Sequence, residues 1–114
     1  MFNDTPVIGP FIKVLPGMDC DNEGRLLACE FEKIILISVY TPHSGVGELK
    51  RLEFRVETWD RAFQAYIEQL NSNGKPVVVC GDLNIIRHDA DIYNTKWVKE
   101  GRPGLTERER ASFE

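Results

Sequence analysis

Several features that mark whole classes of proteins are missing from this 114-residue sequence. It has no long uncharged apolar run, which argues against a membrane-spanning helix. Its first six residues carry no basic flank and no apolar stretch, so we expect no signal peptide. Lys and Arg number 14 against 18 Asp and Glu, a formal net charge of -4, which is unlike a protein that grips nucleic acid by bulk charge alone. These absences still allow an enzyme that meets a phosphodiester at a local site.

Cysteine is also scarce. Cys20, Cys29 and Cys80 form no CxxC pair and have no histidine at zinc-ligand spacing. An odd number of cysteines in a short chain without a leader indicates reduced thiols inside a cell, with nucleus, mitochondrion and bacterial cytoplasm all open. Cys29 and Cys80 lie in apolar runs, so we expect both thiols to be buried.

Two apolar runs separated by a short polar break predict an antiparallel β-hairpin. The runs are residues 25–31 and 34–40, and the second is dense in β-branched residues, which favour strands. The break is Glu32-Lys33, short enough for a tight connection. The preceding residues 1–24 are rich in Pro, Gly, Asp and Asn, and we expect an irregular segment there.

A stripe of apolar residues at steps of three and four predicts a long helix over about residues 48–71. Asn73-Gly74 and the following Pro76 mark its end. The opposite face carries polar residues and is expected to face water. The stripe consists of Leu52, Val56, Trp59, Phe63, Ile67 and Leu70, and the polar face of Arg51, Arg55, Arg61, Gln64 and Glu68.

The helix is followed by a wholly apolar run at residues 76–80, which is typical of a strand covered on both faces. Strand, helix and strand in this order predict a parallel pair with a right-handed crossover, and therefore an α/β fold. Residues 85–114 predict an irregular loop and then the start of a helix. Thr106 and Glu109 fit a capping box at that start, with Thr106 as N-cap.

Polar side chains follow both strands of the expected parallel pair. Tyr40 ends the first strand and His43 lies just beyond it, while Asp82 and Asn84 follow the other. Sites in open α/β sheets lie beyond the carboxyl ends of the strands, so we expect Tyr40, Asp82 and Asn84 to converge on one solvent-facing hollow. A carboxylate can accept a proton from water or help to hold Mg²⁺, and Tyr and Asn can donate to phosphate oxygens. The same residue types also make ordinary turns, so the local pattern alone leaves both interpretations open.

Five stretches, in this order along the chain, resemble the exonuclease III and apurinic/apyrimidinic (AP) endonuclease family, part of the endonuclease/exonuclease/phosphatase superfamily. They are GRLLACEFEKIILISVYTPHSG (24–45), LKRLEFRVETWDRAF (49–63), KPVVVCGDLN (75–84), DIYN (91–94) and GLTERERASF (104–113). The resemblance implies a Mg²⁺-dependent phosphodiesterase, with Mn²⁺ as the other candidate metal. Its substrate would be the DNA backbone next to abasic sites, in base excision repair, sometimes with exonuclease activity.

The resemblance also implies roles for individual residues. The residue matching Tyr40 assists at the scissile phosphate, the one matching Asp82 is the general acid/base, and the one matching Asn84 binds the phosphate or the metal. Asp82 and Asn84 are thus both the catalytic and the metal-binding candidates, and His43 and Asn94 are the substrate-binding candidates. His43 stands where the family usually has Asn, so this contact differs from the family pattern.

The resemblance covers only the middle of the family's domain, so we interpret residues 1–114 as a partial domain. Its expected parts are an irregular segment (1–24), core strands and helix (25–84), and a loop with the start of a helix (85–114). The family adds further metal ligands from its other parts, and in its two-sheet α/β sandwich a second sheet covers the first. We therefore expect the rest of the domain or another protein chain to cover the sheet, and the chain alone to be inactive.

Two other functions remain open from the sequence. The chain can be a non-catalytic, truncated descendant that serves as a structural or interaction subunit of a larger assembly. A simple nucleic-acid-binding module fits less well, because the net charge is negative and no basic stripe is present.

Overall fold

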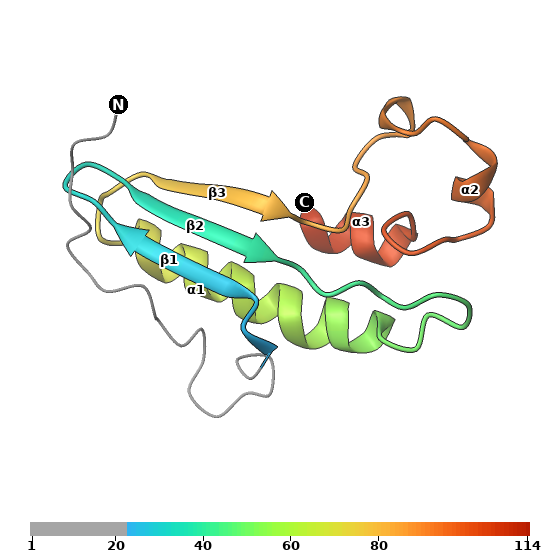
Figure 1. Ribbon diagram of the computed structural model, residues 1–114, viewed down its shortest axis with the longest axis horizontal. Helices are drawn as coiled ribbons and strands as arrows, with labels where there is room; N and C mark the ends of the chain where they lie inside the picture. The colour runs from blue at the N-terminus through green and yellow to red at the C-terminus, as the bar shows by residue number, and fades with distance from the viewer. Residues whose placement is uncertain (1–22) are drawn as a thin grey trace. The chain divides into compact units, whose positions relative to one another are not determined.

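The computed structural model describes residues 23–114, which form a three-stranded sheet and several helical segments (Figure 1). The expected irregular segment 1–24 therefore lies, apart from its last two residues, outside the described residues, as does Cys20. Contacts between Cα atoms divide the chain into two compact units. The first holds the sheet and the helix after residue 61, and the second holds residues 41–61 and 83–114. The elements are β1 (Leu26–Glu30), β2 (Ile35–Tyr40), the π-helix η2 (Phe54–Asp60), α1 (Arg61–Asn71), β3 (Val77–Asp82), the 3₁₀-helix η3 (Asp89–Asp91), α2 (Lys96–Lys99) and α3 (Glu107–Phe113).

The sheet has the strand order β1-β2-β3, with β1 antiparallel and β3 parallel to β2. This confirms the hairpin, the strand–helix–strand unit and the α/β class. The β2–β3 register pairs Ile35 with Val77 at one end and Tyr40 with Asp82 at the other. Strand β3 runs two residues further than we predicted, so the first two residues of the Gly-Asp-Leu-Asn motif belong to the strand.

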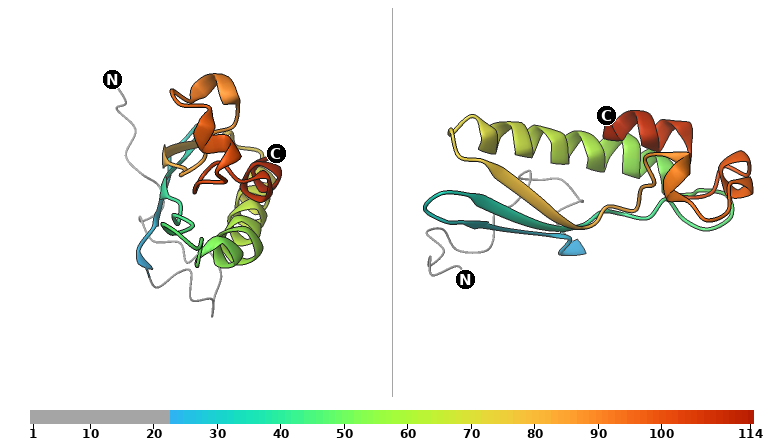
Figure 2. Two further views of the ribbon diagram at one scale, coloured as in Figure 1. Left: turned by 90° about the vertical axis from the view of Figure 1, so that its right-hand side faces the viewer. Right: turned by 90° about the horizontal axis from the view of Figure 1, so that it is seen from above.

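One face of the sheet is covered by α1, as the two views of Figure 2 show. Ile35, Ile37 and Val39 alternate along β2 and are almost completely buried, and the helix contributes Ala62 and Tyr66. Period-two alternation on a strand and a buried helix face together form this core.

The opposite face of the sheet is open in the described part of the chain. Leu27 and Val78 are 41% and 44% exposed. The prediction that Cys80 is buried is wrong: its side chain is exposed, because it shares this face with Val78, whereas Cys29 is intermediate in burial. Within the described residues α1 covers one face of β3, and a cover for the other face stays a prediction.

The long helix begins later than predicted and is not uniformly α-helical. Gly47 and Leu49 have φ values of +85° and +51°, which exclude a right-handed helix at these residues. The first part, η2, is a π-helix, and α1 continues it. Within the described residues, no helix is long and apolar enough to cross a membrane.

The prediction that Arg55 faces water is also wrong, because its side chain is only 2% exposed. A periodicity of 3.6 residues per turn does not apply across a π-helix, which accommodates one more residue per turn. The buried face of the helix therefore shifts. It includes Arg55, Val56 and Trp59 in η2, and Ala62 and Tyr66 in α1 rather than Phe63 and Ile67.

Candidate active site at the strand ends

Tyr40 and Asp82 are neighbours at the carboxyl ends of the two parallel strands. They are register partners in the β2–β3 ladder, so their side chains lie on the same face of the sheet. Both are exposed, Tyr40 by 53%. The guanidinium of Arg25 lies 4.9 Å from the centre of the Tyr40 ring and donates to the Tyr40 carbonyl at 3.2 Å. The structure thus confirms that the phenol of Tyr40 and the carboxylate of Asp82 lie side by side at the strand ends, as the sequence predicts.

Gly81 explains why the motif before Asp82 begins with glycine. Its φ is +130°, and a Cβ atom there would lie 1.9 Å from the carbonyl oxygen of Val39 on β2. Only a residue without a side chain lets β3 approach β2 this closely. The Tyr40–Asp82 pairing therefore depends on Gly81.

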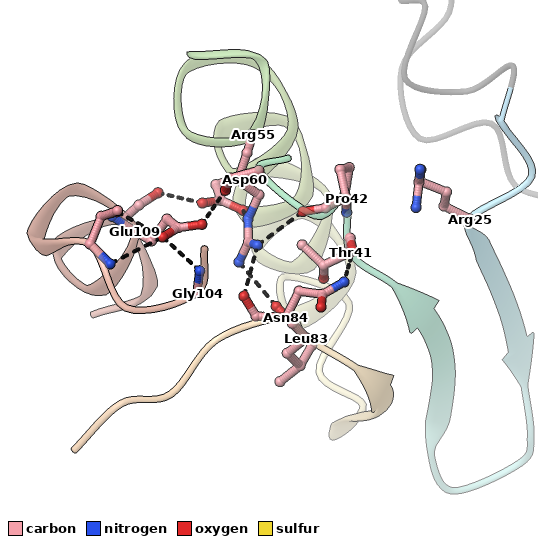
Figure 3. A network of polar contacts seen from close by, with 12 residues as sticks. Arg25, Thr41, Pro42, Arg55, Asp60, Leu83, Asn84, Gly104 and Glu109 are labelled. Atoms are coloured by element: carbon pink, nitrogen blue, oxygen red, sulfur yellow. Dashed lines mark hydrogen bonds and ion pairs between the residues drawn. The ribbon is translucent and has the colours of Figure 1, made fainter. Parts of the chain in front are cut away.

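Asn84 belongs to the second compact unit, where it joins the two loops that follow the strands. Its Nδ2 donates to the carbonyl of Thr41 at 2.8 Å (Figure 3). The backbone of Asn84 has φ +46°, a left-handed conformation that Asn tolerates better than most residues. The convergence of Asn84 with Tyr40 and Asp82 on one hollow stays a prediction.

The same loops bind Arg55, a residue that the helical periodicity predicts to face water. Arg55 donates through Nη1 to the carbonyls of Pro42 (3.1 Å) and Asn84 (3.2 Å), and through Nη2 to the carbonyl of Leu83 (3.0 Å). Its Nε donates to Oδ1 of Asp60 at 2.9 Å. The only sequence signal for this pair was an Asp five residues after an Arg. In an α-helix these two positions lie about 140° apart.

Asp60 is a mostly buried carboxylate with two partners. Burial raises its pKa above the ordinary value of 3.8, and Arg55 and the Ser112 hydroxyl oppose this rise. The Ser112 Oγ donates to Asp60 Oδ2 at 2.8 Å. Asp60 is thus held from α3 as well as from its own helix.

A second buried carboxylate, Glu109, holds the other side of these loops. Its Oε2 accepts from the Gly104 amide at 2.9 Å and from the Thr106 amide at 3.2 Å, which confirms the predicted capping box. Its Oε1 accepts from the hydroxyl of Ser44, which is completely buried. Ser44 lies in the loop after β2, so Glu109 joins α3 to that loop.

The predicted substrate-binding residues make local contacts. His43 is exposed, and its Nδ1 accepts from the Gly45 amide at 3.0 Å, as in an ordinary turn. Asn94 is half-buried, and its Oδ1 accepts from the Lys96 amide at 3.1 Å at the start of α2. Their contacts with a substrate stay predictions.

The residues present do not make a complete magnesium site. Among residues 23–114, no group of three or more His, Cys, Asp or Glu side chains could hold a metal ion. Asp82 and Asn84 offer one carboxylate and one amide, whereas Mg²⁺ is coordinated octahedrally by oxygen ligands. A metal at this edge would need further ligands.

Comparisons with known proteins agree with the resemblance. No family model matches the chain. The chain is 42% identical over 93 residues to a DNA-(apurinic or apyrimidinic site) endonuclease of Dictyostelium discoideum, and 39% identical over 93 residues to an exodeoxyribonuclease of Bacillus subtilis. Each match covers 82% of this chain, but only 25% and 35% of the relatives.

Solved structures show the same fold at lower identity. The 3' phosphatase NExo from Neisseria, bound to a product DNA hairpin, matches with a TM-score of 0.74 at 19% identity. An AP endonuclease from Archaeoglobus fulgidus matches with 0.64 at 17%. These matches cover 96% and 97% of this chain and 41% and 39% of those chains. In sequence the chain therefore resembles one part of AP endonucleases and exodeoxyribonucleases, and in fold one part of the exonuclease and AP endonuclease structures, all of the endonuclease/exonuclease/phosphatase superfamily.

Proposed function

We propose that the chain contributes part of the active site of a Mg²⁺-dependent phosphodiesterase that cleaves the DNA backbone at abasic sites. The observation that carries the proposal is the side-by-side exposure of Tyr40 and Asp82 at the ends of β2 and β3. The relatives named above, an AP endonuclease and an exodeoxyribonuclease, support the reaction class and the DNA substrate.

Each of the three candidate groups has a defined task in this reaction. The carboxylate of Asp82 accepts the proton of the attacking water, or returns a proton to the leaving oxygen. The hydroxyl of Tyr40 donates a hydrogen bond to charge that develops on the phosphate. Asn84 binds the phosphate or the metal. Because residues 23–114 hold too few metal ligands, we propose that the missing ligands come from outside this range or from another chain.

Carboxylate and phenol substitutions in the natural full-length protein test the proposal. We expect Asp82→Asn to lower kcat on abasic-site DNA by about 100-fold or more, the usual contribution of a positioned acid or base. Tyr40→Phe removes one donor and should lower kcat by less. Glu48→Gln is the matched control, since the Glu48 side chain is 83% exposed and lies in a loop. If Asp82→Asn kept the wild-type turnover, the Gly-Asp-Leu-Asn motif would be only a structural turn. That result would favour the alternative function, a non-catalytic subunit of a larger assembly.

The open face of the sheet is the surface on which we expect a binding partner. Apolar side chains at 41–44% exposure, such as Leu27 and Val78, are stabilised when another surface covers them. We propose that the remainder of the domain, or a second protein chain, covers this face in the active protein.

The free thiols bear on the compartment. Cys80 is exposed and free, and Cys29 is free and half-buried. Unpaired thiols are typical of proteins in reducing surroundings, so we propose that the protein works in a reducing compartment of the cell.

A further inference from the structure

The chain segments that follow β2 and β3 are held together by one buried guanidinium. Arg55 donates to the Pro42 carbonyl after β2, and to the Leu83 and Asn84 carbonyls after β3 (Figure 3). Three backbone acceptors from two segments thus share one side chain that is 2% exposed. Hydrogen bonds from a charged donor are stronger than those between neutral groups, and a planar fork fixes their directions.

Asp60 fixes the orientation of this fork. It accepts from Arg55 Nε at 2.9 Å on one oxygen and from Ser112 Oγ at 2.8 Å on the other. A buried guanidinium without a counter-charge is strongly destabilised, so the pair acts as a unit. Lysine at position 55 would keep the charge, but its single ammonium group could not reach three carbonyls and a carboxylate in this geometry.

The bound carbonyls lie next to the candidate catalytic groups along the chain. Pro42 follows Tyr40 by two residues, Leu83 follows Asp82 directly, and Asn84 is itself a candidate. A displacement of about 1 Å at a reacting group can lower a rate about 100-fold. A contact that sets the separation of these segments therefore acts on catalysis without touching the substrate.

We propose that Arg55, oriented by Asp60, is a positioning residue that holds the segments after β2 and β3 at the separation catalysis requires. The inference rests on the proposed phosphodiesterase function and adds to it a residue that stays outside the substrate site. It predicts a larger loss in kcat than change in KM, because Arg55 orients the reacting segments and does not itself bind the DNA.

The test compares Arg55→Ala, Arg55→Lys and Arg61→Ala in the natural full-length protein on abasic-site DNA. Arg61 is the matched control, an arginine on the same helix whose side chain is 71% exposed. With kcat corrected for the folded fraction, we expect Arg55→Ala to lose about 10- to 100-fold, Arg55→Lys to lose nearly as much, and Arg61→Ala to remain at the wild-type value. Millimolar guanidinium, but not urea, should restore part of the kcat of Arg55→Ala by occupying the vacated space.

Two results would overturn the inference while leaving the proposed function intact. The first is a wild-type kcat in folded Arg55→Lys or Arg55→Ala. The second is an equal loss in Val56→Ala, a core truncation on the same helix, without rescue by guanidinium in Arg55→Ala. If Arg55→Ala does not fold, Arg55→Lys alone decides. A wild-type protein that does not cleave abasic-site DNA would instead overturn the proposed function, and this inference with it.

Discussion

At the scale of single residues, the site depends on the side chains of Tyr40 and Asp82 and on the absence of a side chain at Gly81. Gly81 and Gly74 both have positive φ values, +130° and +81°. A Cβ at Gly81 would lie 1.9 Å from the Val39 carbonyl oxygen, whereas a Cβ at Gly74 would meet nothing within 4 Å. Alanine substitutions at these two glycines therefore separate the energetic cost of a left-handed backbone from the cost of a steric clash.

We expect Gly74→Ala to lower the free energy of unfolding by about 1–2 kcal/mol, the usual penalty for a left-handed backbone. Gly81→Ala should lower it by clearly more, because β3 must also move away from β2. Chemical denaturation of both variants measures the difference. Equal losses would mean that the strands separate at no further energetic cost.

The buried carboxyl group of Asp60 makes the stability of the folded protein depend on pH. Burial raises its pKa above 3.8 in the folded protein, so the folded state binds this proton more tightly than the unfolded state. By linkage, the contribution of Asp60 to stability falls as the pH rises from about 3.8 through the raised pKa, and is constant above it. The free energy of unfolding of the wild type, measured relative to that of Asp60→Asn, should therefore decrease as the pH rises across this range. An NMR titration that places the pKa of Asp60 at or below 3.8 would contradict this.

At the scale of elements, the π-helix η2 is what brings Arg55 and Asp60 together. Five residues apart, the two side chains would lie on different faces of an α-helix, but the wider turn of a π-helix brings them to one face. If η2 carries one extra residue relative to an α-helix, deleting one residue within it should restore α-helical register and keep the pair as i and i+4 neighbours.

We therefore expect deletion of Thr58 to change the free energy of unfolding by less than about 2 kcal/mol. Deletion of Ala65, an exposed residue of α1, should be far more damaging. It rotates the following residues by about 100° and removes Tyr66 from the core. Thermal unfolding of the two deletion variants provides the comparison. The interpretation of η2 fails if the Thr58 deletion is as destabilising as the Ala65 deletion.

The elements also show what the sequence could and could not predict. The strands, their pairing and the capping box at Thr106 follow from local patterns, and the structure confirms them. The role of Arg55 did not follow, because a constant period of 3.6 residues per turn does not apply across the π-helix η2. The exposure of Cys80 was missed because an apolar run does not reveal whether both of its faces are covered.

At the scale of the whole molecule, the open face of the sheet and the incomplete metal site lead to one prediction. Purified alone, the 114-residue chain should not cleave abasic-site DNA with Mg²⁺, since residues 23–114 contain no group of three metal-ligating side chains. It should also self-associate through Leu27 and Val78. Light scattering and a cleavage assay on the same sample test both expectations.

A matched pair of variants assigns the association to the open face. Leu27→Thr combined with Val78→Thr should shift the chain toward the monomer, because threonine is less apolar than leucine or valine and its β-branched shape still suits a strand. Val46→Thr, at a loop residue that is 90% exposed, should leave the mass unchanged. A monodisperse, active monomer of the wild-type chain would show that the chain is complete as it stands.

The parallel pairing of β2 with β3 also has a consequence for the order of folding. The β1–β2 hairpin joins residues that are close in sequence, whereas Cys80 and Ile37, in contact across β2 and β3, are 43 residues apart. Local pairs form in microseconds, and pairs across long loops form later because closing the loop costs entropy. Truncation in the hairpin, as in Ala28→Gly, should therefore slow folding, whereas Val79→Ala should chiefly speed unfolding, and a chevron plot separates the two. The phenol and the carboxylate of the site would then meet only as the last strand docks.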